Sequence, residues 1–282
     1  MNKPLQILFI FLCAFACFQV KAQFNVLGDA VPTDVCNCFE VTQNAGNKRG
    51  MVWRTESFDL SNSFDLTIQF FLGFNNSSKW QGADGMAFII HNSNTTLGAF
   101  GGGFGYAGIT PSLGVIIDTY ENSGDGDPGG DLDHISLHQN GDRAHNTVNE
   151  LIGAMPVKSN SADVEDSAYH DLRVVWNQSN TSFKVYFDDE LRINYVGDIV
   201  NDIFGGNPIV YWGVSASTGG AFNQQKFCYQ LEASNIITQP LMSCLGDTVY
   251  LKDESTSFFG IDNVVWDFND GTTKSEIGRA HV

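Results

Sequence analysis

Apolar and polar residues alternate along several stretches of the chain. Every second residue is apolar from Phe64 to Phe70 and again from Phe183 to Phe187. A period of two places successive side chains on opposite faces of a β-strand. The stretches Leu172 to Trp176 and Ile209 to Ser215 are more continuously apolar, which is typical of buried strands. The pattern therefore predicts strands in all four ranges.

The segments between these stretches predict turns and loops. Asp188 and Asp189 separate two strand-like runs and occupy the position of a hairpin turn. Glycine, serine and asparagine are frequent in the other connections, and no long segment has the 3.6-residue apolar period of a helix. We expect an all-β fold of two packed antiparallel sheets, in which the loops carry the function.

The amino terminus has the features of a secretory signal. An apolar run extends from about Leu5 to Val20, and Val20-Lys21-Ala22 forms a small-residue cleavage signature, which predicts a signal peptide over residues 1–22. A lipid anchor on Cys17 is the alternative. No other apolar run is long enough to span a bilayer, so we expect an extracellular or cell-surface protein without membrane insertion.

Four cysteines remain after removal of this signal: Cys36, Cys38, Cys228 and Cys244. An exported chain with four cysteines allows three disulfide pairings. Cys36 and Cys38 are too close in sequence to pair readily. We expect one of them to join Cys228, tying the first strand of a domain to its last.

The charge balance restricts the class of partner. The chain has 32 acidic and 15 basic residues, with a formal net charge of −17. Nucleic acids and anionic membranes are disfavoured, because phosphate binding needs clustered Lys and Arg. Divalent cations and neutral ligands remain, although acidic residues also serve solubility alone.

Acidic residues gather between Asp118 and His134, in the sequence DTYENSGDGDPGGDLDH. Calcium takes six to eight oxygen ligands from carboxylates, amides, carbonyls and water. The candidate ligands are Asp118, the Tyr120 carbonyl, the Asn122 side chain, and either Asp127 or Asp125. The alternative is a solvated acidic loop without an ion.

An EF-hand loop is excluded. For a loop that starts at Asp125, Gly129 stands at the third ligand position and Ser136 at the position of the closing glutamate.

Four motifs in order resemble the L-type lectins, which include legume lectins, animal cargo lectins and bacterial relatives. They are ADGMAFIIH (83–91), GGGFGYAG (101–108), IDTYEN…DP…DHIS (117–136) and WGVSASTGG (212–220), and the resemblance covers roughly residues 24 to 235. It implies a concanavalin-like sandwich (jelly roll) of two antiparallel sheets. It also implies calcium-dependent binding of glycans, without catalysis, at adjacent calcium and sugar sites on the loops.

The resemblance assigns roles to individual residues. Asp84, joined to Ala83 by a cis peptide bond, accepts hydrogen bonds from two sugar hydroxyls, and Asn122 donates to one. A backbone amide of Gly102 or Gly103 adds a donor, and Tyr120 offers a flat face to the sugar. Calcium orders Asn122 and, through water, the turn at Asp84. The loop that selects the sugar corresponds to Gly219, Gly220 and Ala221.

Two departures from the family pattern affect the metal ligands. Relatives with a second, transition-metal site carry a glutamate two residues before the first aspartate, where this chain has Ile116. This argues against manganese. His134, the other ligand of that metal by resemblance, is present, and we interpret it as orienting Asp127 or Asp118. The spacing from Asn122 to Asp127 is one residue longer than in some legume lectins, so Asp125 is an alternative metal ligand. The proline after Asp127 favours Asp127, because the family has a proline in that position.

Two rival classes of function fit less well. A glycoside hydrolase of this fold uses an ExDxxE or ExDxE strand motif. Here Ile116 stands where the nucleophilic glutamate is needed, so Asp118 and Glu121 are present without the nucleophile. A structural or adhesive module with calcium-stiffened loops would not need Asp84, the glycine run and Asn122 together. Four further histidines are interpreted as surface or strand residues, namely His91, His138, His145 and His170.

The last part of the chain predicts a second domain. A boundary is expected near 236–240, and Trp266 to Gly271 resembles the WDFGDG signature of PKD domains, with Asn269 in place of a glycine. We expect a lectin-like domain over 23–236 and an incomplete, partial immunoglobulin-like PKD sandwich over 237–275. Residues 276–282 look unlike its continuation and suggest a truncated end. Several domains or oligomers would give multivalent binding.

Overall fold

A computed structural model describes residues 23–35, 38–74, 82–129, 132–160 and 163–229, together with the strands 263–267 and 273–277. The expected signal peptide, Cys36, Cys244 and the expected domain boundary lie outside the described residues. In the part of the chain that is described, no helix has the length and apolar character needed to cross a bilayer.

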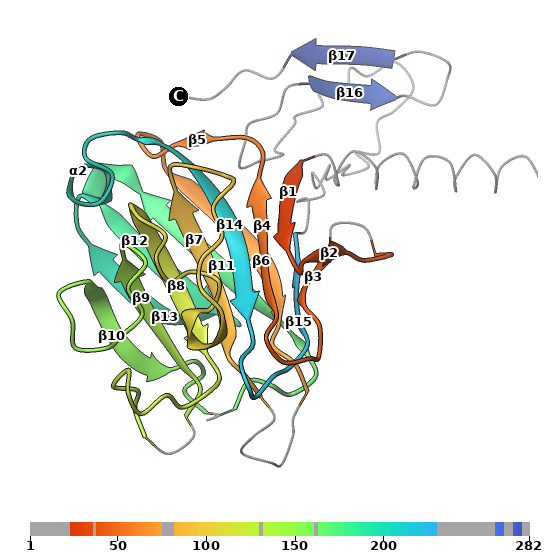
Figure 1. Ribbon diagram of the computed structural model, residues 1–282. Coiled ribbons are helices and arrows are strands. Elements are labelled where there is room, and N and C mark those ends of the chain that lie inside the picture. Colours follow the sequence, from red (N-terminus) through yellow and green to blue (C-terminus); the bar gives the residue numbers. More distant parts are fainter. Residues whose placement is uncertain are drawn as a thin grey trace, which may run out of the picture. The chain divides into compact units, whose positions relative to one another are not determined.

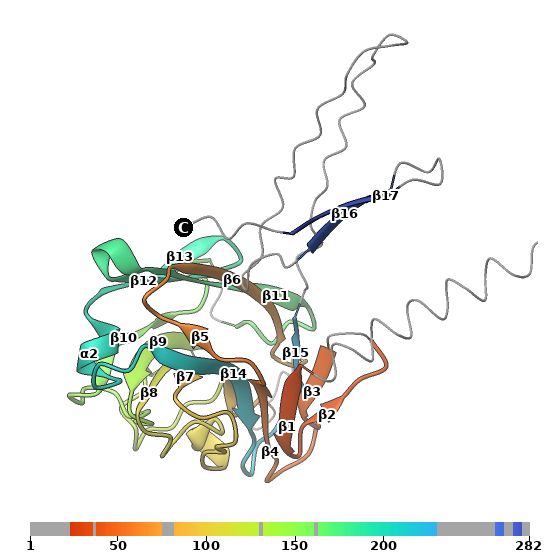
Figure 2. The ribbon, with the colours of Figure 1, turned by 90° about the horizontal axis from the view of Figure 1, so that it is seen from above.

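Two antiparallel sheets lie face to face in the larger part of the chain (Figures 1 and 2). The order in the larger sheet is β1 (Phe24–Gly28), β4 (Arg49–Arg54), β14 (Ile209–Ser217), β7 (Gly85–His91), β8 (Ser112–Asp118), β9 (His134–Gln139) and β10 (Glu150–Pro156), with β5 (Phe58–Asp59) paired to β14. The order in the smaller sheet is β13 (Glu190–Val196), β12 (Ser182–Phe187), β11 (Tyr169–Asn177), β6 (Phe64–Phe71), β15 (Gln225–Cys228), β3 (Cys38–Thr42) and β2 (Val31–Pro32). The expected all-β sandwich is confirmed.

Helices are short in the described residues. They are η1 (Gly101–Gly103), η2 (Gln178–Asn180) and α2 (Ile199–Asp202). The chain divides into two compact units, Met1–Tyr229 and Gln230–Val282. In the second unit, β16 (Asn263–Asp267) pairs antiparallel with β17 (Thr273–Ile277). The PKD-like assignment and the domain limits stay predictions.

The alternation in the sequence matches the strands. Burial alternates along β6, where Phe64, Leu66 and Ile68 face the interior. Asp188 and Asp189 join β12 to β13 with φ values of 47° and 67°, the left-handed backbone that a two-residue hairpin turn requires.

One strand differs from its predicted burial. The apolar run Leu172 to Trp176 does not make β11 a strand buried on both faces, because Arg173 is exposed and the buried residues alternate. Arg173 Nε donates to Asp65 Oδ1 on the neighbouring β6 at 2.7 Å. The smaller sheet therefore has one packed face and one solvated face at this point.

Both faces of the larger sheet are covered, which explains why β7 and β8 are buried at every position. One face packs against the smaller sheet, where the Trp212 ring contacts Phe227 at 6.2 Å between centroids. The other face packs under the loop that contains Phe104, Tyr106 and Ile109. That loop continues from η1, so its apolar contacts fix the position of the glycine turn.

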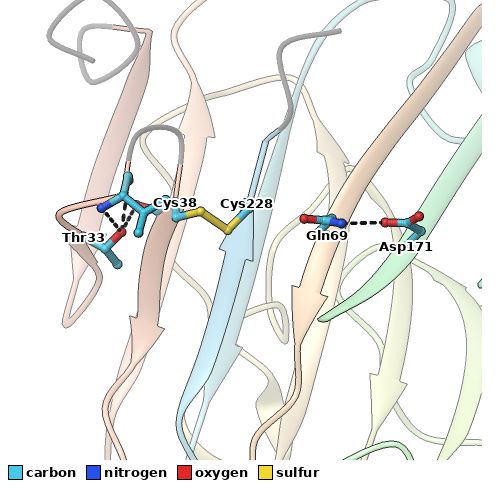
Figure 3. Close-up of a disulfide and its surroundings, with 6 residues drawn as sticks. Thr33, Cys38, Gln69, Asp171 and Cys228 are labelled. Carbon is cyan, nitrogen blue, oxygen red and sulfur yellow. Dashed lines mark hydrogen bonds between the residues drawn. A yellow bond between two sulfur atoms is a disulfide. The ribbon is translucent and has the colours of Figure 1, made fainter. Parts of the chain in front are cut away.

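A disulfide joins Cys38 to Cys228, 190 positions apart in sequence (Figure 3). The two cysteines face each other on neighbouring strands, β3 and β15. This pairing agrees with one of the two expected bridges to Cys228. The bridge does not involve the first strand as expected, because β1 lies in the other sheet.

Candidate functional site

Asp84 lies where β7 begins, beside the ends of two neighbouring strands. The peptide bond between Ala83 and Asp84 is cis, as the resemblance implies. The Asp84 backbone N–H donates to the Ser217 carbonyl at 3.0 Å, and the Thr119 N–H donates to the Asp84 carbonyl at 3.1 Å. The Gln225 side chain donates to the Ala83 carbonyl at 3.0 Å. Strand ends and a buried glutamine thus hold this turn in place.

The Asp84 carboxyl group is buried but not satisfied. It is 4% exposed, and its Oδ2 atom finds no hydrogen-bond partner among the described residues. Burial raises the pKa of Asp84 to about 7, although Arg143 and the Gly219 backbone amide oppose the rise. A β-carbon at Gly219 would lie 3.4 Å from Oδ2, so glycine lets this loop approach the carboxyl group closely. An unpartnered acceptor in this position is ready for a ligand donor.

The glycine turn η1 faces the acidic loop. A β-carbon at Gly102 would lie 3.0 Å from Asn122 Oδ1, which places the Gly102 backbone against the Asn122 side chain. The Gly103 amide already donates to the Phe100 carbonyl at 3.1 Å, and Gly103 is buried. Of the two glycines expected to donate to a ligand, the geometry favours Gly102.

Carboxylates converge in the loop between β8 and β9. Asp118 is 5% exposed and accepts from the Tyr120 N–H at 2.9 Å. The Asn122 N–H donates to Asp127 Oδ2, while Asp127 Oδ1 is buried and has no hydrogen-bond partner in the described ranges. Burial, and then the charge of Asp127, raises the pKa of Asp118 well above its usual range. A positive charge at this point would stabilise the ionised form of both carboxyl groups.

These residues fit a calcium ion. The Asn122 amide nitrogen lies 3.0 Å from the Tyr120 carbonyl oxygen. Because the two ends of an amide are assigned from the network, rotating it would turn Oδ1 toward the same point. Together with Asp118 and Asp127 this loop offers the oxygen-rich, flexible donor set that calcium prefers.

Asp125, the alternative ligand, is engaged elsewhere. Its carboxylate forms an ion pair with Arg143, and its carbonyl accepts from the His145 N–H at 2.8 Å. The geometry favours Asp127 as the ligand, in agreement with the proline that follows it.

His134 lies behind the two carboxylates and is 1% exposed. Its Nε2 atom is 3.6 Å from Asp118 Oδ2 and 3.0 Å from His145 Nε2. Burial lowers the pKa of His134. The contact with His145 is not apparent from the sequence, since eleven residues separate the two histidines.

The other histidines depart from expectation in one respect. His91, His138 and His170 lie on strands, as interpreted, and all three are buried. His145 lies in neither place, because it belongs to the connection between β9 and β10 and is only 9% exposed. Sequence reasoning missed His145 and also Arg143, which lies on this connection too.

The remaining predicted residues line the rim of the site. The Gly219 carbonyl accepts from the Asn47 N–H at 3.0 Å, which anchors the loop after β14. Nothing lies within 4 Å of a β-carbon at Gly220, whereas Ala221 is buried at 9% exposure. Tyr120 is partly exposed. The structure thus brings the glycine turn close to both Asp84 and Asn122, and Gly219 close to Asp84.

A stacked pair of antiparallel sheets with an acidic loop and a glycine turn at one end defines the class of jelly-roll β-sandwiches found in lectins. The family model described as the legume lectin beta-barrel domain matches residues 16–231. The chain therefore belongs to the L-type lectin family.

Solved structures share this fold. The lectin from Bauhinia forficata in complex with GalNAc has a TM-score of 0.59 and 19% identity, over 75% of this chain and 92% of its own. Peanut lectin with a nine-residue peptide has a TM-score of 0.57 and 21% identity, over 73% and 90%. The exoplasmic/lumenal domain of VIP36, in a form bound to Ca2+ and mannose, has a TM-score of 0.56 and 18% identity, over 76% and 86%.

Proposed function

We propose that this protein is a calcium-dependent, non-catalytic carbohydrate-binding protein that acts outside the cell. The observation that carries the proposal is the buried, unpartnered carboxyl oxygen of Asp84, which lies between the loop at Gly219 and the glycine turn. A buried acceptor without a donor is costly unless a ligand supplies one. Sugar hydroxyl groups are such donors, and the solved relatives include forms with GalNAc and mannose.

Each residue has a distinct part in binding. Asp84 accepts from hydroxyl groups, Asn122 and the Gly102 amide donate, and Tyr120 covers an apolar face of the ring. Calcium, when bound to Asp118, Asp127, Asn122 and the Tyr120 carbonyl, supplies the positive charge that these carboxylates require. Asn122 belongs to both sets, so the order of the acidic loop determines the order of the sugar site.

Catalysis is not proposed. Ile116, which occupies the nucleophile position of the related hydrolases, is 2% exposed and packs in the apolar cluster with Tyr106. The relatives named above are lectins, which bind sugars without cleaving them. A single site of this kind binds weakly, so repeated domains or oligomers would provide the strength.

A glycan array tests the function. The purified chain is applied in calcium and again after chelation, with folding checked by circular dichroism in both states. Binding in calcium alone is expected, and the array then names the sugar class. Absence of binding by the folded, calcium-loaded protein would support a structural module instead.

A further inference from the structure

Three carboxyl groups gather between the loops that precede β9 and β11. Asp133 comes directly before β9, and Asp163 and Glu165 belong to the connection between β10 and β11. One carboxylate oxygen from each residue lies within 4.8 Å of the other two. In the part of the chain that the structure describes, no Lys or Arg side chain forms an ion pair with Asp133 or Glu165.

This cluster of carboxyl groups extends from the interior to the surface. Asp133 is 5% exposed, Glu165 is partly buried, and Asp163 is exposed. Like charges this close together, and partly removed from water, destabilise the ionised form of each group unless a proton or a cation offsets them. A cation from solution can reach the cluster at Asp163.

An amide group orients each of the three carboxyl groups. The Val164 N–H donates to Asp133 Oδ2 at 2.7 Å. The Glu165 N–H donates to Asp163 Oδ1 at 2.8 Å, and the Asn223 side chain donates to Glu165 Oε1 at 3.0 Å. An ionised carboxylate has about four acceptor positions, so each group keeps lone pairs for a further partner.

Thr119 gives an independent indication of a ligand. Its side chain faces the Glu165 carboxyl group, and the residue is 8% exposed. Thr119 Oγ1 is buried and has no hydrogen bond of ordinary geometry with any described residue. A hydroxyl oxygen carries two acceptor lone pairs, and burying them without a partner is costly. A cation beside the carboxylates would satisfy them.

The cluster lies directly behind the turn that carries Asp84. Glycine at position 82 lets Glu165 approach the backbone there, because a β-carbon at Gly82 would collide with Glu165 Oε2. The Thr119 N–H donates to the Asp84 carbonyl at 3.1 Å. Two members of the cluster therefore contact the residues on either side of Ala83.

We propose that a calcium ion, separate from the one proposed in the acidic loop, binds at Asp133, Asp163, Glu165 and the Thr119 hydroxyl group. All four donors are oxygen atoms and three are carboxylates, the set that calcium prefers, whereas zinc is bound mainly by nitrogen and sulfur. Ligands on opposite sides of calcium, at about 2.3–2.6 Å each, stand roughly 5 Å apart. Oxygen atoms within 4.8 Å of one another can therefore share one such ion.

An ion in this position would join three segments that meet only in the folded chain. They are the residues after β8, the residues before β9, and the β10–β11 connection. Every ligand is a protein group, so the inference does not rest on the proposed sugar binding.

Counting bound calcium on the full chain tests the site. The protein is stripped with a chelator and titrated with calcium by calorimetry, and the calcium bound at saturation is measured by equilibrium dialysis. We expect about two equivalents in the wild type and about one in Glu165→Gln protein. Asp163→Asn, at an exposed position, replaces Glu165→Gln if that variant does not fold. A single equivalent in the wild type, or two in the folded variant, would overturn the proposal.

Matched variants separate a ligand from a nearby charge. Asp166→Asn is the control and should keep both equivalents, because Asp166 follows Glu165 in sequence but is bonded to His170 at 3.1 Å. Thr119→Val, which keeps the shape of the side chain, should weaken the affected binding event roughly tenfold.

Thermal unfolding gives a second readout. Calcium should raise the midpoint of unfolding less in Glu165→Gln protein than in Asp166→Asn protein, since only the first variant has lost a ligand. Equal rises in the two variants would contradict the assignment. The glycan array is read separately, so wild-type protein that binds sugar with a single calcium ion would refute this site and leave the proposed function intact.

Discussion

At the scale of single residues, the proposed site contains three carboxyl groups that the fold removes from water. Asp84, Asp118 and Asp127 each have a side chain whose charge is offset only in part by neighbouring protein groups. The charge state of these carboxyl groups therefore depends on the ligand that binds to them. Substitution of one such group therefore tests ligand binding more directly than it tests folding.

Asp84→Asn should remove sugar binding while preserving the fold. The substitution keeps the shape of the side chain but replaces a charged acceptor that is worth about 1.5–3 kcal/mol, or roughly 10- to 150-fold in affinity. Affinity for the sugar found on the array is measured by calorimetry. Asp65→Asn serves as the control, since Asp65 is exposed on the smaller sheet. Full affinity in folded Asp84→Asn protein would remove Asp84 from the site.

Without bound metal, Glu165 gives the protein a dependence on pH that is separate from that of the acidic loop. Burial raises the pKa of Glu165 to about 9, against a hydrogen bond from Asn223, and the charges of Asp133 and Asp163 add to the rise. Since its ordinary value is 4.5, the folded state favours the protonated form, and this stabilisation is complete below pH 4.5 and lost as the pH approaches 9.

Glu165→Gln should remove the loss of stability that occurs as the pH rises toward 9. The glutamine stays neutral, so the free energy of unfolding of the variant relative to the wild type should rise as pH increases from 5 to 9. Urea unfolding in chelator at several pH values measures the difference. A difference that stays constant with pH would contradict the assignment to Glu165.

At the scale of elements, the strands were more predictable than the contacts between loops. The alternation over Phe64 to Phe70 predicted β6, because one face of that strand packs and the other is solvated. The apolar run Leu172 to Trp176 was misleading, since Val175 sits on the half-exposed face opposite the core. A mostly apolar segment forms a strand that is buried on both faces only where both sides of the sheet are covered, as they are for β7.

The candidate site was predictable only where a motif carried it. Asp84 and Asn122 are recognised because each stands in a short segment similar to lectins. His145 has no such segment, and its partners Asp127 and His134 become neighbours only when the two connections fold together. The period of two along β9 does place His134 and His138 on one face of the sheet. This was the only indication in the sequence that histidines gather beside the acidic loop.

Gly102→Ala tests the contact between the glycine turn and the acidic loop. The new methyl group would lie 3.0 Å from Asn122 Oδ1, closer than most such contacts, so Asn122 must move. We expect weaker sugar binding with little loss of stability. Gly124→Ala is the control from the acidic loop itself, because nothing lies within 4 Å of its β-carbon. Equal affinities of the two variants would argue against this contact.

At the scale of the whole molecule, the lectin unit is a sandwich with one covalent cross-link in its described part. The disulfide joins the edge region of the smaller sheet, β3, to β15 and closes a loop of 190 positions. A cross-link of this span restricts the unfolded chain far more than the folded one. Its main effect is therefore on stability rather than on the shape of the site.

Replacement of Cys38 and Cys228 by alanine together should lower the free energy of unfolding by about 2–5 kcal/mol. Sugar affinity at low temperature should be unchanged, because Cys228 stands at the end of β15 opposite to the loop that follows β14. Urea unfolding of oxidised protein and of the double variant measures the loss. Equal stabilities would mean that the bridge does not form in solution.

The same bridge determines how the unit responds to mechanical tension. If the chain is pulled on either side of the two cysteines, the force passes from Cys38 directly to Cys228, and the residues between them carry none of it. Asp84, Asn122 and Gly219 all lie inside this shielded length. Stretching the oxidised protein from its ends should release only the outer segments, and reduction should add roughly 650 Å of extension. The proposed sugar site thus lies in the part of the chain that a pull along the backbone cannot extend while the disulfide is intact.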